Sequence, residues 1–132
     1  MSETNNTDLY IAATADSPEV DFRFSTNSLS LKGESYPENA AAFYDEIIAR
    51  TRAFLANGSG PVTIDVALAY FNSSSTKMLF NLFDTLNEAA ERGTKIVLNW
   101  YHDSEDDTIQ EFGQELHDDF AAIEFHARVL SN

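Results

Sequence analysis

Ala69-Tyr70-Phe71-Asn72-Ser73-Ser74-Ser75-Thr76-Lys77 marks the point in this sequence where an apolar strand gives way to an amphipathic helix. Apolar residues occupy every second position of 62–69, which is the pattern of a strand, and small or polar residues occupy the positions between them. We expect helices to pack on that small-residue face. Downstream, apolar residues recur at spacings of three and four until Gly93, which predicts a helix over 74–92.

The hydroxyls of Ser73, Ser74, Ser75 and Thr76 therefore lie at a helix N-terminus. Unpaired backbone N–H groups and the positive end of the helix dipole make this a favourable place for added negative charge. A phosphate here would be tolerated and would add roughly −1.5 to −2 charges to the surface that the turn presents. The alternative is that Asn72 or Ser73 simply caps the helix, because Ser, Thr and Asn are preferred caps in all helices.

The rest of the sequence predicts a single α/β domain with a mixed sheet and about three helices, arranged as two layers or as a sandwich. Alternation predicts an antiparallel hairpin near the N-terminus, and strand–helix–strand order in the middle of the chain predicts parallel strands. Ser35 and Glu38 have the spacing of a capping box, which places the start of the first helix there, with Pro37 in its first turn. The expected strands are 9–14, 20–24, 28–32, 62–69, 95–101 and 122–128, and the later helices are 74–92 and 106–119.

Composition limits the classes of partner. The chain has 132 residues, and 22 acidic against 8 basic residues give a formal net charge of −14. This charge repels nucleic acid and anionic lipid, so we expect neither as a partner, and a protein partner should present a basic surface. Segment 1–8 lacks the features of a signal peptide and is expected to be disordered, followed by one domain over 9–132. With no cysteines and no apolar run of membrane-spanning length, we expect a cytoplasmic protein.

No pattern for a metal, a cofactor or a catalytic centre stands out. The acidic run 103–107 invites a calcium interpretation, but an EF-hand loop from Asp103 would need Gly and Glu where Thr108 and Gln114 stand. We expect these carboxylates to complement the start of a helix instead. The histidines lack metal-binding spacing, and there is no nucleophile elbow, P-loop or dinucleotide fingerprint. We therefore expect no metal, no cofactor and no catalytic residue.

Four aromatic residues stand where two predicted strands end, close to the hydroxyl run: Tyr70, Phe71, Trp100 and Tyr101. Aromatic side chains dominate binding surfaces, so these four are candidates for a rim around the turn that contacts a partner. The alternative is that they pack in the core or at its edge.

Three motifs in order resemble the SiaC family of bacterial regulatory phosphoproteins, and the resemblance spans most of the chain. They are Gly33-Glu34-Ser35-Tyr36-Pro37-Glu38-Asn39, Tyr70-Phe71-Asn72-Ser73-Ser74-Ser75 and Asn99-Trp100-Tyr101. More distantly, Asn72-Ser73-Ser74 is similar to the strand-to-helix turn of STAS-type anti-sigma-factor antagonists, which carry Asp-Ser-Ser there. This second resemblance implies a STAS-like fold.

The SiaC resemblance implies a regulator and not an enzyme. Members of the family are phosphorylated by a dedicated kinase-like protein and dephosphorylated by a PP2C-type phosphatase. When unphosphorylated they bind and activate a diguanylate cyclase, which links them to cyclic-di-GMP and biofilm behaviour. The acceptor in the family is the first hydroxyl after the Asn, usually Thr, and that position is Ser73 here; Ser74, the STAS-like position, is the alternative.

The helix over 74–92 and the aromatic rim are expected to form the docking face. A dianion at Ser73 is expected to weaken binding through desolvation and like-charge repulsion. The expected partner-binding residues are Tyr70, Phe71, Asn72, Ser74, Ser75, Trp100 and Tyr101.

Other functional classes remain open at this point. The chain could be an anti-sigma-factor antagonist, or a non-switching acidic adaptor whose hydroxyl turn is only a cap, and a small hydrolase is a third alternative. Phosphate incorporation by a cognate kinase separates the switch from the adaptor, and turnover of a generic ester would reveal a hydrolase.

Overall fold

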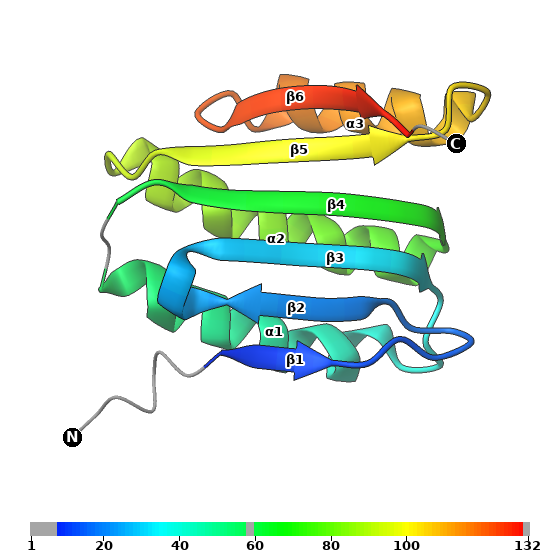
Figure 1. The fold of residues 1–132 in the computed structure, drawn as a ribbon, viewed down its shortest axis with the longest axis horizontal. Coiled ribbons are helices and arrows are strands. Elements are labelled where there is room, and N and C mark those ends of the chain that lie inside the picture. The colour runs from blue at the N-terminus through cyan, green and yellow to red at the C-terminus, as the bar shows by residue number, and fades with distance from the viewer. Residues whose placement is uncertain (1–7, 58–59, 131–132) are drawn as a thin grey trace.

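The computed structural model describes residues 8–57 and 60–130, and these form one six-stranded sheet with three α-helices on one of its faces (Figure 1). The strands lie in the sheet in the same order as in the chain. The elements are β1 (Leu9–Ile11), β2 (Glu19–Arg23), the 3-10 turn η2 (Phe24–Thr26), β3 (Ser28–Ser35), α1 (Ala40–Ala56), β4 (Val62–Phe71), α2 (Ser73–Glu91), β5 (Ile96–His102), α3 (Asp107–Asp119) and β6 (Glu124–Val129).

Chain connections explain the direction of each strand. β1, β2 and β3 follow one another without an intervening α-helix and are antiparallel. β3, β4, β5 and β6 are parallel, because a helix after each of the first three carries the chain back to the end of the sheet where the next strand begins. The predicted mixed α/β fold is therefore confirmed, with its antiparallel N-terminal hairpin, parallel strands and three helices. It has two layers and not three.

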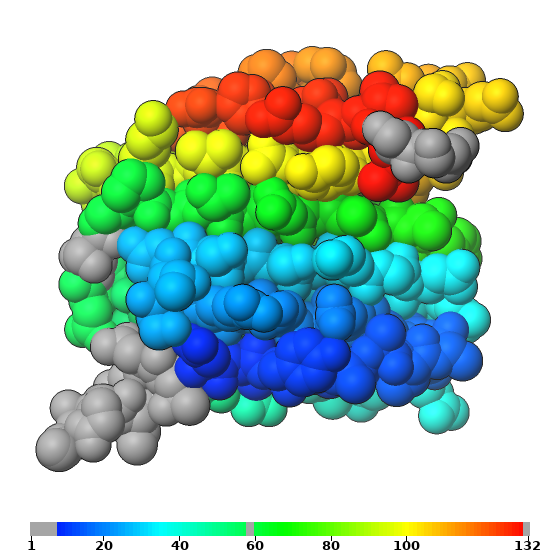
Figure 2. Space-filling view, viewed as in Figure 1, coloured from blue at the N-terminus to red at the C-terminus, as the bar shows by residue number. Residues whose placement is uncertain are grey.

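The core lies between the sheet and the helices. Large apolar side chains of β4 face this core, with Val62, Ile64, Val66 and Leu68 at most 3% exposed. The opposite face of β4 carries Thr63, Asp65, Ala67 and Ala69, and the helices of the described residues all lie behind the sheet in the view that leaves this face uncovered (Figures 1 and 2). The prediction that helices pack on this small-residue face was wrong, because covering the larger apolar side chains removes more apolar area from water.

The boundaries of β3 and α1 correct a second prediction. Ser35 does not cap α1 but ends β3, which is longer than the expected 28–32, and Asn39 caps α1 by accepting a hydrogen bond from the backbone N–H of Ala42 at 3.0 Å. The predicted capping box was therefore wrong. Strand pairing with β4 continues as far as Ser35 opposite Phe71 and accounts for the difference.

At the N-terminus, most of the segment 1–8 that we expected to be disordered lies outside the described residues. Asp8 is described, and its carboxylate accepts hydrogen bonds from the backbone N–H and the hydroxyl of Ser25, at 2.9 and 3.0 Å. This residue is thereby held against η2.

Candidate functional site

The hydroxyl run begins directly after β4, with Asn72 as the single residue between strand and helix. The side-chain oxygen of Asn72 accepts a hydrogen bond from the backbone N–H of Ser75 at 2.9 Å, so Asn72 caps α2. The hydroxyl of Thr76 donates to the carbonyl oxygen of Asn72 at 3.1 Å. The turn therefore lies at the carboxyl end of a parallel strand, as expected, and its cap is Asn72 and not Ser73.

Ser75 lies beneath the turn and is fully buried. Its hydroxyl accepts a hydrogen bond from the hydroxyl of Ser35 at 2.8 Å, and the Ser35 hydroxyl lies 2.7 Å from the hydroxyl of Tyr44 on α1. Because a hydroxyl has one hydrogen, Tyr44 must donate to Ser35 when Ser35 donates to Ser75. Burial raises the pKa of Tyr44 to about 12, which keeps it protonated as that donor.

The backbone N–H of Asn72 also donates to the carbonyl oxygen of Ser35, at 3.1 Å. The turn is thus fixed to the end of β3 through the main chain and to α1 through the buried hydroxyls. The side chain of Ser75 is therefore covered in this conformation, and its bond to Ser35 helps to fix the position of the turn.

Ser73 and Ser74 are both exposed, and they face different sides of α2. Ser74 lines a hollow of about 310 Å³ together with Lys77, Met78 and the start of α1. Ser73 precedes Phe80 by seven residues, almost two full turns, so both lie on the same side of the helix. The ring of Phe80 contacts the rings of Phe112 on α3 and of Phe120 directly after α3, at centroid distances of 5.3 and 5.9 Å. Ser73 therefore faces α3, and Ser74 faces α1.

The four aromatic residues expected to form one rim lie on different surfaces. Tyr70 is 50% exposed and packs its ring against Tyr36 at 5.7 Å. Phe71 points to the helix side, 4.8 Å from Phe112. Trp100 is 1% exposed and donates its indole N–H to the carbonyl oxygen of Ile109 at 2.9 Å. Tyr101 lies on the open face of the sheet.

The expected rim is thus only partly formed. Trp100 belongs to the core, as the alternative interpretation held, and its indole is covered by α3, to which it is hydrogen-bonded. Phe71 and Tyr70 lie on opposite faces of the sheet, as neighbouring residues of a strand do. The register of β3 against β4 shifts between Gly33 and Glu34 and leaves Ala69 as an extra residue, and this shift places Phe71 on the helix side and Tyr70 on the open face.

An aromatic cluster joins β4, α2, β5 and α3, and sequence reasoning missed two of its six members. Its buried members are Phe83 and Trp100, and the half-buried members are Phe71, Phe80, Phe112 and Phe120. Phe71 and Trp100 are rim candidates from the sequence, and Phe83 and Phe112 fall on the expected apolar stripes of their helices, but Phe80 and Phe120 were not predicted. The three-residue spacing between Phe80 and Phe83 on α2 is the signal that could have identified Phe80.

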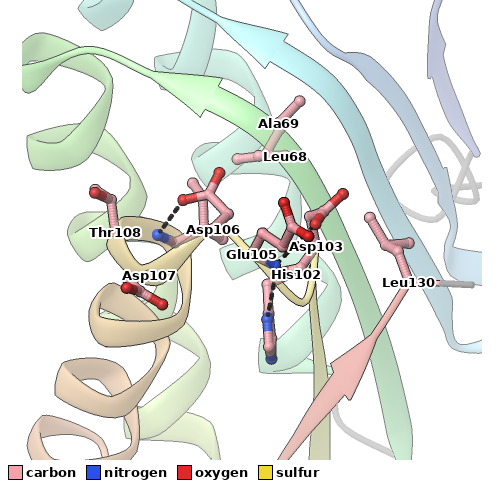
Figure 3. Close-up of a pocket in the computed structure, with 10 residues that line it drawn as sticks. Leu68, Ala69, His102, Asp103, Glu105, Asp106, Asp107, Thr108 and Leu130 are labelled. Carbon is pink, nitrogen blue, oxygen red and sulfur yellow. Dashed lines mark hydrogen bonds between the residues drawn. The ribbon is translucent and has the colours of Figure 1, made fainter.

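A second hollow of about 640 Å³ lies at the carboxyl ends of β4 and β5 (Figure 3). Its acidic lining consists of Asp103, Glu105, Asp106 and Asp107. Two of these carboxylates have structural partners: Asp106 caps α3 by accepting from the backbone N–H of Ile109 at 3.0 Å, and Asp103 accepts from the N–H of Glu105 at 2.9 Å. The expectation that the acidic run complements a helix start is confirmed for Asp106.

Two further properties concern residues 8–57 and 60–130. Nowhere in these ranges do three or more His, Cys, Asp or Glu side chains gather in a way that could hold a metal ion. Likewise, none of the helices described in these ranges has the length and apolar character needed to cross a membrane.

We expect Asn72→Ala to lower the free energy of unfolding by about 1 kcal/mol, because it removes the cap of α2. Ser73→Ala should change it by less than about 0.5 kcal/mol, since the exposed Ser73 side chain has no capping role. Urea denaturation of both variants measures the difference. A larger loss for Ser73→Ala than for Asn72→Ala would contradict this assignment of the cap.

The fold and the turn define a small α/β domain that presents hydroxyls at a helix start, and comparison with known proteins identifies its family. A family model described as SiaC family regulatory phosphoprotein matches residues 11–130, so the chain belongs to the SiaC family. It is therefore a regulatory protein and not an enzyme.

Individual relatives agree with this assignment. An uncharacterised protein of Pseudomonas aeruginosa (strain UCBPP-PA14) is 33% identical over 122 residues, which cover 90% of this chain and 97% of that protein. The structure of SiaC of Pseudomonas aeruginosa superimposes with a TM-score of 0.87 at 31% identity, covering 94% of this chain and 99% of the other. The SiaC chain in a complex from the same species, described as diguanylate cyclase SiaD with its activator SiaC, gives 0.88 at 31% identity, with 93% and 100% covered.

Proposed function

We propose that this chain is a phosphorylation-controlled partner-switching protein that binds and activates a diguanylate cyclase when it is unphosphorylated. Its family membership and its similarity to a SiaC that is described as the activator of a diguanylate cyclase support this proposal. In this proposal the protein acts in the cytoplasm and controls cyclic-di-GMP and biofilm behaviour. A kinase-like protein adds the phosphate and a PP2C-type phosphatase removes it.

The observation that carries the proposal is the exposure of Ser73 at the first position of α2. The other three hydroxyls of the run are less suitable as acceptors of the phosphate group. Ser75 is buried, Thr76 is bonded to the carbonyl oxygen of Asn72, and Ser74 faces the hollow beside α1. A phosphate on Ser73 would lie at the positive end of the dipole of α2, so the fold would tolerate it.

The charge of the chain limits how this phosphate can act. A protein with a net charge of −14 favours a basic partner, and a basic partner is attracted by added negative charge. Like-charge repulsion therefore cannot be the main effect. The cost of removing water from the phosphate, together with its volume, is the stronger effect against binding. The hydrated dianion would have to be buried where the partner covers the turn and the neighbouring ring of Phe71.

Incubation with the cognate kinase and ATP should add one phosphate to the protein, on Ser73. Ser73→Ala should prevent the incorporation, whereas Ser74→Ala, the matched control one residue further on, should retain it. Mass spectrometry of the intact protein and of its peptides measures both. Phosphate found only on Ser74 would move the acceptor to the side of α2 that faces α1, and none on 73–76 would leave a non-switching adaptor.

A further inference from the structure

The half-buried rings of Phe71, Phe80, Phe112 and Phe120 form a continuous apolar surface on the helix side of the molecule, which we name the aromatic surface. Neighbouring rings are in contact: Phe71 and Phe112 at 4.8 Å, Phe112 and Phe80 at 5.3 Å, and Phe80 and Phe120 at 5.9 Å. These rings come from β4, α2, α3 and the residue after α3. All four are only partly buried against the core, although aromatic side chains gain most from full burial.

The helices that flank the aromatic surface are strongly acidic. α2 carries three carboxylates, Asp84, Glu88 and Glu91, against one lysine, Lys77. α3 carries five carboxylates, Asp107, Glu111, Glu115, Asp118 and Asp119, and neither lysine nor arginine. Contiguous apolar area rimmed by charge of one sign is the arrangement of a protein docking site, in which the apolar part supplies affinity and the rim selects the partner.

We propose that the aromatic surface binds a basic amphipathic helix of a partner protein, whose apolar stripe covers the four rings and whose lysine or arginine residues pair with the acidic rim. α2 and α3 are neighbours on the helix side of the sheet (Figure 1). The rings of Phe80 on α2 and Phe112 on α3 bridge them at a centroid distance of 5.3 Å. A helix that lies along them presents apolar residues every three or four positions, and two such turns span about 10 Å. This is also about the length along α2 from Ser73 to Phe80, which are seven residues apart.

The acidic rim decides against other occupants. A second copy of this chain, placed on the same surface by a two-fold axis, would bring two acidic rims together at the cost of like-charge repulsion. Nucleic acid and anionic lipid are repelled for the same reason. An apolar helix without basic residues would leave the carboxylates of α3 partly desolvated and unpaired.

This inference deepens the proposed function, on which it rests for the identity of the partner, because it names the binding element of the effector. It also favours Ser73 over Ser74 as the residue that such a partner senses, since Ser73 is on the side of α2 that carries Phe80. The surface can be tested without the kinase or the effector. A failure of the phosphorylation experiment and a failure of this one are therefore distinguishable.

The probe is a labelled helical peptide of about 18 residues, roughly 27 Å long, with a leucine stripe flanked by lysines. Two matched peptides serve as controls: one in which glutamates replace the lysines, and one in which a central proline breaks the helix. Fluorescence anisotropy gives the affinities, and NMR chemical-shift changes in the labelled protein locate the binding site. The lysine peptide should bind best and shift the signals of α2 and α3, and its affinity should fall as salt is raised.

Protein variants complete the test. Phe80→Ala should weaken binding of the lysine peptide about tenfold, whereas Tyr10→Ala, which removes an exposed ring from the open face of the sheet, should not. Glu115→Lys, an exposed change that spares the core, should weaken the lysine peptide and strengthen the glutamate peptide. Glu34→Lys changes the net charge equally on the open face and should do neither.

Three results would overturn the proposal: no binding of the lysine peptide up to about 1 mM, equal binding of the glutamate or proline peptide, or chemical-shift changes confined to α1 or to the open face of the sheet.

Discussion

Replacing Trp100 by alanine should lower the free energy of unfolding by about 3–5 kcal/mol. Trp100 is 1% exposed and its indole contacts the rings of Phe71, Phe83 and Phe112 at centroid distances of 5.5 to 6.3 Å. Truncation would leave a cavity beneath α3. It would also remove the hydrogen bond that the carbonyl oxygen of Ile109 accepts from the indole N–H.

A paired variant tests the same contact from the side of the helix. Gly113 allows α3 to approach the sheet, because a Cβ built on it would clash with Cδ1 of Trp100 and would lie 2.6 Å from its Nε1. Gly113→Ala should therefore destabilise the protein, even though alanine favours a helix by about 1 kcal/mol over glycine.

Urea denaturation, followed by circular dichroism, measures both changes, and Tyr101→Ala is the control from the neighbouring position on the open face. The assignment of Trp100 to the core would be wrong if Trp100→Ala cost less than about 1 kcal/mol, or if Gly113→Ala were stabilising.

The order and type of the elements could be predicted from the sequence because each one carries its own signal. Strict alternation over 62–68 and the three-and-four spacing after Asn72 are local patterns that survive in the folded chain as β4 and α2. Strand ends were less predictable, since Ser35 and Phe71 extend their strands by pairing with each other, and this pairing involves residues far apart in the chain.

The faces of the sheet near the turn could not be predicted. Alternation alone places Leu68 and Tyr70 on the same face, but the extra residue Ala69 reverses the pattern, so Tyr70 is exposed and Phe71 is directed towards the helices. The buried bond between Ser35 and Ser75 also joins residues 40 positions apart and has no local signal. Capping by Asn72 is the part of the site that local chemistry did specify, although the choice between Asn72 and Ser73 needed the structure.

Phosphorylation of Ser73 should weaken binding of the cognate diguanylate cyclase by about a hundredfold or more, because a dianion would be buried at the contact. Ser73→Ala should bind like the unmodified protein. Ser73→Asp should bind with intermediate affinity, since aspartate has one charge and lacks the volume of a phosphate. Ser74→Asp is the matched control, and its effect should be smaller because Ser74 faces the hollow beside α1.

Calorimetric titration of the cyclase against these forms, at low and high salt, separates the two ways in which the charge could act. Repulsion between exposed charges is screened by salt, whereas desolvation of the phosphate is not, so high salt should not restore binding of the phosphorylated form. Phe71→Ala should weaken binding of the unmodified protein by more than about 1 kcal/mol if this ring lies in the contact. Trp100→Ala is unsuitable for this purpose, because its effect on folding would obscure any effect on binding. Equal affinity of the alanine, aspartate and phosphorylated forms would show that the partner does not sense Ser73.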